Sequence, residues 1–164
     1  MTRLLAVLAV VLLSGCASYS GRDLQPGKAT AGDVTALMGP PGMEVKRPNG
    51  DTWLYFPRNP WGRVTYVAAL GPDGLLIDVE QRLTYDNIHS IKKDQRIEDV
   101  RLLLGPPREV WLMPRTGWPI WEYAWWFANK EMRVLWVYYS VDDGVVRRVT
   151  EQHDYNDQPE NSRF

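Results

Sequence analysis

The chain has one cysteine, Cys16, and only two histidines, His89 and His153. A single cysteine cannot form an internal disulfide. Neither histidine belongs to a His-x-x-x-His pair, and no serine stands in the Gly-x-Ser-x-Gly pattern of an exposed nucleophile. These shortages predict that the chain is not an enzyme and has no catalytic residue, metal site or cofactor. His153 with Asp154 and Asp157 stays open as a weak metal alternative to a solvated polar tail.

Clustered basic charge is also missing. The formal net charge is −1, and lysine and arginine are scattered among aspartate and glutamate. Because binding of phosphates needs a concentrated basic face, a nucleic-acid partner is excluded. No feature points to a small-molecule substrate. What the chain has in quantity is aromatic: eight tryptophans and eight tyrosines in 164 residues, enough to stabilise a small folded core.

The first residues have the form of a targeting signal. A basic start at Thr2-Arg3 precedes ten apolar residues, Leu4 to Leu13. Ten helical residues cover roughly half of a bilayer core, so this run predicts a signal peptide over residues 1–15 and not a permanent span.

The next residues, Leu13-Ser14-Gly15-Cys16, resemble a bacterial lipobox. The resemblance implies cleavage between Gly15 and Cys16 and a covalent lipid on Cys16. Several acyl chains together hold a protein firmly on a membrane. Residues 16–26 would then be the lipidated N-terminus and a flexible tether. Ala17 in place of aspartate favours the outer membrane, facing the periplasm, over the inner membrane. The alternative is an ordinary signal peptide with an incidental cysteine.

Two stretches of the chain are near twins. DVTALMGPPGME runs from Asp33 to Glu44, and DVRLLLGPPREV runs from Asp99 to Val110, 66 residues later. Each has apolar residues at helical spacing, and each ends in a glycine followed by two prolines. Both therefore predict a short amphipathic helix with an abrupt stop. Thr30 with Asp33 predicts a capping box at the start of the first helix.

The similarity continues in the same order downstream. Trp53-Leu54-Tyr55 matches Trp121-Glu122-Tyr123 at an offset of 68, and the Asp-Gly pairs ending at Gly74 and Gly144 match at 70. An ordered series with a slowly drifting offset indicates an internal repeat. We predict a first repeat over 27–86, a second over 87–157, and a polar tail over 158–164.

Each Asp-Gly pair lies between two apolar runs, which is a strong signal for a β-hairpin and hence for antiparallel strands. A short helical turn is predicted at Asn87 to Ile91. The predicted fold class is α+β: two tandem helix-plus-antiparallel-strand repeats that form one antiparallel sheet with the helices on one face.

The lipobox, the paired helices ending in Gly-Pro-Pro, the Trp-x-Tyr strands and the Asp-Gly hairpins together resemble the BamE-like (SmpA/OmlA-type) outer-membrane lipoproteins. The general plan is also similar to the β-lactamase-inhibitor protein fold, which pairs two helix-plus-sheet repeats. The first resemblance implies a non-catalytic lipoprotein that binds an envelope protein and assists outer-membrane protein assembly or envelope integrity. The chain departs from BamE in having two units. An inhibitor-like module acting on an envelope enzyme is the alternative, and a cell-wall hydrolase is a third.

The segment from Trp111 to Phe127 is the richest in aromatics. Strand alternation places Trp121, Tyr123, Trp125 and Phe127 on one face, which we expect beneath the helices. The other face then offers a partner-binding patch of large apolar side chains. We assign to this patch Trp118, Trp126, Trp136 and Tyr138, extended in the first repeat by Leu54 and Phe56. The alternative is that all these rings fill the core.

Overall fold

The computed structural model describes residues 20–58, 63–128 and 131–153. The predicted signal peptide, the lipidation site at Gly15 and Cys16, and the predicted tail at 158–164 lie outside the described residues, as do Asp154 and Asp157.

Both Gly-Pro-Pro stretches end a helix, as predicted. Helix α2 spans Ala31–Met38, and the capping box of Thr30 with Asp33 is present at its start. The backbone and side-chain hydrogen bonds from Thr30 lower the pKa of the Asp33 carboxyl. Helix α4 spans Ile97–Leu104. The glycines that follow, Gly39 and Gly105, have φ of 84° and 86°, a conformation that favours glycine. The short helix α3, Tyr85–His89, starts two residues before the predicted turn.

The strands form two four-stranded antiparallel sheets, which corrects the prediction of a single sheet. Their orders are β1-β2-β3-β4 and β5-β6-β7-β8. The first sheet contains β1 (Met43–Lys46), β2 (Thr52–Pro57), β3 (Thr65–Leu70) and β4 (Leu76–Gln81). The second contains β5 (Glu109–Leu112), β6 (Pro119–Trp126), β7 (Met132–Ser140) and β8 (Val145–His153). Both predicted Asp-Gly hairpins are present, as β3–β4 and β7–β8.

One edge of each sheet is partly occupied by backbone from its own unit. Leu76 on β4 accepts a hydrogen bond from the Gly27 N–H and donates one to the Ala29 carbonyl. Val146 on β8 does the same with Asp94 and Gln95. In each unit the segment before the helix therefore occupies part of the β4 or β8 edge and hinders pairing of the two sheets there.

Strand pairing defines which residues of the two units are equivalent. Met43 pairs with Tyr55 as Glu109 pairs with Glu122, so the offset on β2 and β6 is 67 (122 − 55). Val67 and Trp136 are likewise equivalent, because they pair with Tyr55 and Glu122. The pairing skips Ile77 on β4 and Arg147 on β8, which places a bulge at the same position in both units. The tandem plan therefore extends to the register of the strands.

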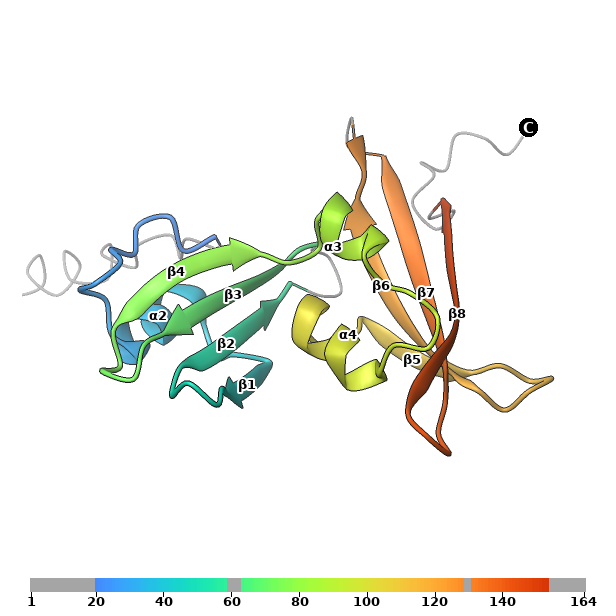
Figure 1. The fold of residues 1–164 in the computed structure, drawn as a ribbon. Coiled ribbons are helices and arrows are strands. Elements are labelled where there is room, and N and C mark those ends of the chain that lie inside the picture. Colours follow the sequence, from blue (N-terminus) through green and yellow to red (C-terminus); the bar gives the residue numbers. More distant parts are fainter. Residues whose placement is uncertain (1–19, 59–62, 129–130, 154–164) are drawn as a thin grey trace, which may run out of the picture.

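The elements stack in four layers (Figure 1). Helix α2 packs on one face of the first sheet through Val34 and Met38, and α4 lies between the two sheets. The helices therefore do not share one face of one sheet. On the second sheet α4 and α3 cover Trp121, Tyr123 and Trp125, with Phe127 packed beside them, which confirms the predicted face of β6.

Helix α4 also joins the two units, because its last turn contacts both sheets. The Tyr55 hydroxyl of the first sheet donates to the Leu102 carbonyl at 2.7 Å, and the Tyr123 hydroxyl of the second donates to the Gly105 carbonyl at 3.1 Å. The last carbonyls of a helix lack partners inside the helix, so these two bonds satisfy groups that would otherwise be left unpaired. Burial raises the pKa of both tyrosines, for Tyr55 against a smaller opposite effect of Arg82 and Arg47.

The part of the predicted tether that the structure describes, residues 20–26, is packed and not extended. Gly21 is buried within reach of Met38, and Leu24 packs against the core of the first unit. Contacts of Gly21 and Leu24 place these residues against the first unit, and Gly27 and Ala29, which follow them, are hydrogen-bonded to Leu76 on β4. The tether over residues 16–26 stays a prediction.

Replacing each helix-ending glycine by alanine tests the contact between the units. Gly39→Ala places a Cβ in open space, whereas the Cβ of Gly105→Ala meets Thr65 Cγ2 at 2.8 Å and Tyr55 Cδ1 at 3.0 Å. Both variants carry the same backbone strain, of about 1 to 3 kcal/mol. We expect Gly105→Ala to lower the free energy of unfolding, measured in urea, by clearly more than its matched control. Equal losses would show that α4 does not pack on the first sheet.

Candidate functional site

The face of the second sheet turned away from α3 and α4 is the candidate site, and we call it the open face. The residues that strand pairing assigns to it include Glu109, Trp111, Ile120, Glu122, Ala124, Trp126, Met132, Val134, Trp136, Tyr138, Arg148, Thr150 and Gln152. No helix in the described part of the chain lies on it (Figure 1).

A buried carboxylate stands at the centre of the open face. Glu122 is 8% exposed, and both its oxygens are bound. Arg108 donates from Nε to Oε1 at 2.8 Å and forms an ion pair with the same oxygen, while Trp136 Nε1 donates to Oε2 at 2.8 Å. A charge buried in this way persists only because it is paired and hydrogen-bonded. The bonds fix the orientation of the Trp136 ring on the face.

Aromatic rings surround this carboxylate. Trp111 meets Trp136 edge to face at 5.4 Å between ring centroids. Guanidinium groups lie over two other rings, Arg148 over Tyr138 at 5.6 Å and Arg63 over Trp126 at 5.4 Å. Such rings are preferred anchors at protein interfaces. The open face therefore presents flat apolar rings, with charge at defined points.

The predicted patch is partly present. Trp126 is 42% exposed, and Trp136 and Trp118 are half-buried, Trp118 in the turn before β6. Tyr138 lies on the open face but is buried. Leu54 and Phe56 are wrong as patch residues, because they are buried beneath α2 at 4% and 1% exposure.

The error at Leu54 and Phe56 comes from a slip of one residue. The Trp-x-Tyr match at offset 68 equates Tyr55 with Tyr123, whereas the pairing offset is 67 and equates Phe56 with Tyr123. Successive strand residues point to opposite faces, so the slip moves every side chain of β2 to the wrong side.

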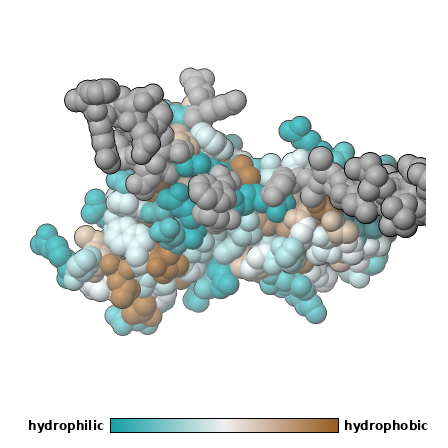
Figure 2. All heavy atoms as spheres, turned by 180° about the vertical axis from the view of Figure 1, so that it is seen from behind, coloured by the Kyte–Doolittle hydropathy of each residue, from teal (hydrophilic) through white to brown (hydrophobic). Residues whose placement is uncertain are grey.

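The exposed edge strand β5 was missed by the sequence reasoning. Val110 and Leu112 are 57% and 63% exposed. Strand pairing places Val110 opposite Trp121 and Leu112 opposite Pro119, so both project from the face that carries α3 and α4 and not from the open face. Figure 2 views the molecule from behind, and the largest group of hydrophobic atoms on that side lies over the half that carries the second sheet.

A shallow pocket of about 270 Å³ lies between the first sheet and α4. In it the Trp53 ring has a guanidinium on two sides, from Arg47 at 4.5 Å and from Arg82 at 4.9 Å. The α4 side is formed by Asp99, Leu102 and Leu103. Arg82 is also paired with Glu80 at 3.0 Å. The pocket therefore belongs to the packing contact between the two units.

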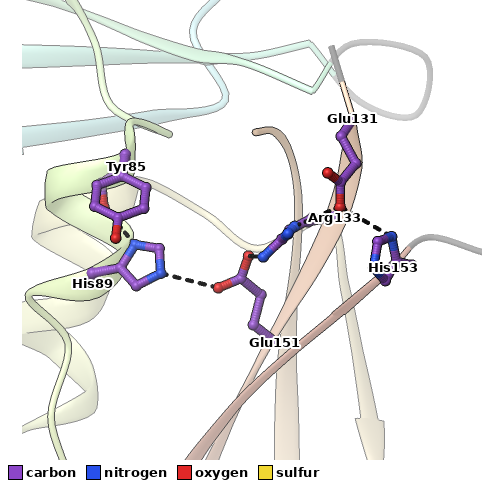
Figure 3. A network of polar contacts seen from close by, with 6 residues as sticks. All are labelled: Tyr85, His89, Glu131, Arg133, Glu151 and His153. Atoms are coloured by element: carbon purple, nitrogen blue, oxygen red, sulfur yellow. Dashed lines mark hydrogen bonds and ion pairs between the residues drawn. The ribbon is translucent and has the colours of Figure 1, made fainter. Parts of the chain in front are cut away.

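Both histidines belong to one polar network (Figure 3). His89 Nε2 lies 3.1 Å from Glu151, and His153 Nδ1 lies 3.0 Å from Glu131. Arg133 bridges the two carboxylates, and these bonds raise the pKa of its guanidinium. His89 Nδ1 is bonded to the Tyr85 carbonyl at 2.8 Å, so both its ring nitrogens are engaged. The network links α3 to β7 and β8, and its engaged nitrogens favour a structural over a catalytic role.

Residues 20–58, 63–128 and 131–153 contain neither a cluster of metal ligands nor a helix suited to span a membrane. No group of three or more histidine, cysteine or acidic side chains in these ranges is placed to hold a metal ion. None of the helices in these ranges is long and apolar enough to cross a membrane.

Comparison with known proteins leaves the family open. No family model matches the chain, and no curated protein matches it. A DUF4309 family protein, YjgB from Bacillus subtilis, has 19% identity over 80% of this chain and 83% of its own, with a TM-score of 0.32. A proposed β-lactamase inhibitor protein from Streptococcus mutans has 10% identity over 76% of this chain and 82% of its own, with a TM-score of 0.33. At these scores neither similarity carries an argument about this chain, and its resemblance to BamE stays a prediction.

The Glu122 network gives a stability test. Glu122→Ala removes the partner of both Arg108 and Trp136 Nε1. Because hydrogen bonds to a charged group are worth about 1.5 to 3 kcal/mol, we expect a loss of about that size in the free energy of unfolding. The matched control is Glu44→Ala, an exposed glutamate on β1 of the other sheet, which should change it by less than about 0.5 kcal/mol. Equal effects of the two substitutions would contradict the assignment.

Proposed function

We propose that the chain is a lipid-anchored, non-catalytic lipoprotein of the bacterial envelope that binds a protein partner through the open face. The partner would be an envelope protein, and assistance to outer-membrane protein assembly is the role that the resemblance to BamE implies. The anchor rests on the lipobox at Leu13 to Cys16.

One observation carries the binding role. The open face presents an exposed Trp126 together with half-buried Trp111 and Trp136. Large apolar side chains gathered on a surface favour a protein interface. The buried ion pair of Glu122 with Arg108 supports this use, because it holds the Trp136 ring in one orientation before a partner arrives.

Lipidation is tested at its acceptor. Cys16→Ala should abolish incorporation of radioactive palmitate and leave an unprocessed chain, because the thiol that carries the lipid is absent. The measurement is gel mobility and autoradiography after growth with the label, with the unchanged chain as control. Label that persists in the variant would contradict the anchor.

The interface is tested by photocrosslinking in intact cells. A photoreactive phenylalanine derivative at Trp126 or Trp136, both on the open face, should capture one envelope protein, identified by mass spectrometry. The matched control is the same probe at Ile77, which is 50% exposed on β4, far from the open face in the order of layers. A soluble enzyme as the adduct would favour the inhibitor alternative. Equal adducts from all three positions would contradict a defined binding face.

A further inference from the structure

The first sheet shows what covers a face of this kind. Its counterpart to the open face carries Tyr55, Thr65 and Val67, which are all nearly inaccessible to solvent. The cover is α4 of the second unit: Leu102 accepts a hydrogen bond from Tyr55, and Gly105 lies against Tyr55 and Thr65. In this repeat, the sheet of one unit is therefore packed beneath the helix of the next.

The second sheet has the equivalent face without such a helix among the described residues. Strand pairing equates Tyr55 with Glu122, Val67 with Trp136, and Thr65 with Val134. The helix equivalent to α4 is α2, and the offset of 66 equates Leu102 with Ala36 and Asp99 with Asp33. Ala36, Gly32 and Asp33 are exposed, so α2 presents outward the positions that α4 uses against the first sheet.

The sizes of the side chains fit this pairing. Beneath α4, the first sheet has small residues on β3, Thr65, Val67 and Ala69, which leave room for Leu102 and Leu103. On the open face, β7 carries the large Trp136 and Tyr138, and α2 offers the small Ala36 and Gly32. The exchange of large and small keeps the helix at a similar distance from the sheet.

We propose that the open face of one copy binds the outward side of α2 of a second copy, so that the layers of helix and sheet continue from molecule to molecule. This deepens the proposed function and rests on it, because it names the partner of the same face. The interface is heterologous, so each copy uses a different surface at each end and the association builds chains of lipoproteins on the membrane.

The equivalences choose a cysteine pair for the test. Leu102 and Arg82 line one pocket between α4 and the first sheet. Their equivalents are Ala36, which is exposed, and Gln152, which is half-buried on the open face. In membranes of cells that produce the full chain, Ala36→Cys/Gln152→Cys should give a ladder of disulfide-linked oligomers on oxidation. Cys16 is the only other cysteine, and the unchanged chain controls for it.

The matched control pair is Ala36→Cys/Ile77→Cys, which keeps the α2 cysteine and moves the other to exposed β4; it should give no ladder. Ala36→Arg, a surface substitution, should also abolish the larger species that the unchanged chain forms in detergent, as measured by sedimentation. Absence of the ladder, or a ladder of equal strength in the control, overturns this inference. If the Trp126 photoprobe then captures a different protein, the proposed function stands while the second copy as partner is rejected. If the probe captures nothing, both fail.

Discussion

The last turn of α4 is the contact on which the tertiary structure depends. Two tyrosine hydroxyls reach it from opposite sides, Tyr55 from the first sheet and Tyr123 from the second. Each donates a hydrogen bond to a backbone carbonyl at the end of the helix. Gly105 ends the helix in a conformation that favours glycine, and its missing Cβ lets the first sheet approach closely. One glycine thus serves both helix termination and packing between the units. Its equivalent Gly39 needs only the first property, because nothing lies within 4 Å of its Cβ position.

This contact explains why a duplicated sequence gives two sheets and not one. Each helix packs on its own sheet, and α4 in addition packs on the outer face of the preceding sheet. The units therefore stack through faces, while the edges of β4 and β8 are partly occupied by the backbone before each helix. Stacking leaves one sheet face at the end of the series without a helix. The second unit compensates on that face with large rings and with a carboxylate fully bonded by Arg108 and Trp136, so that Ile120 is buried even there.

The two units are alike in backbone and unlike in the use of their faces. The bulge at Ile77 recurs at Arg147, and the helix ends recur at Gly39 and Gly105. Side chains at equivalent positions differ strongly in size, as Val67 and Trp136 do. Because backbone pairing between the strands maintains the architecture of both units, the side chains on the sheet faces can differ between the units without changing the fold. The polar network of His89, Glu151 and Arg133 contributes to the fold, since it joins α3 to the strands.

Local signals in the sequence were sufficient for the elements themselves. The capping box at Thr30, the stops at Gly39 and Gly105, and both Asp-Gly hairpins follow from interactions between residues close in the chain, and the alternation of β6 placed Trp121 and Trp125 beneath the helices. The register between the repeats was beyond sequence matching, since identical letters suggested an offset of 68 where hydrogen bonding between strands sets 67, and this parity decided that Phe56 is core. The separation of the sheets and the position of α4 between them were also decided only in three dimensions. They depend on which edge is already bonded and on whether Gly105 can approach Tyr55, and these are contacts between residues far apart in the chain.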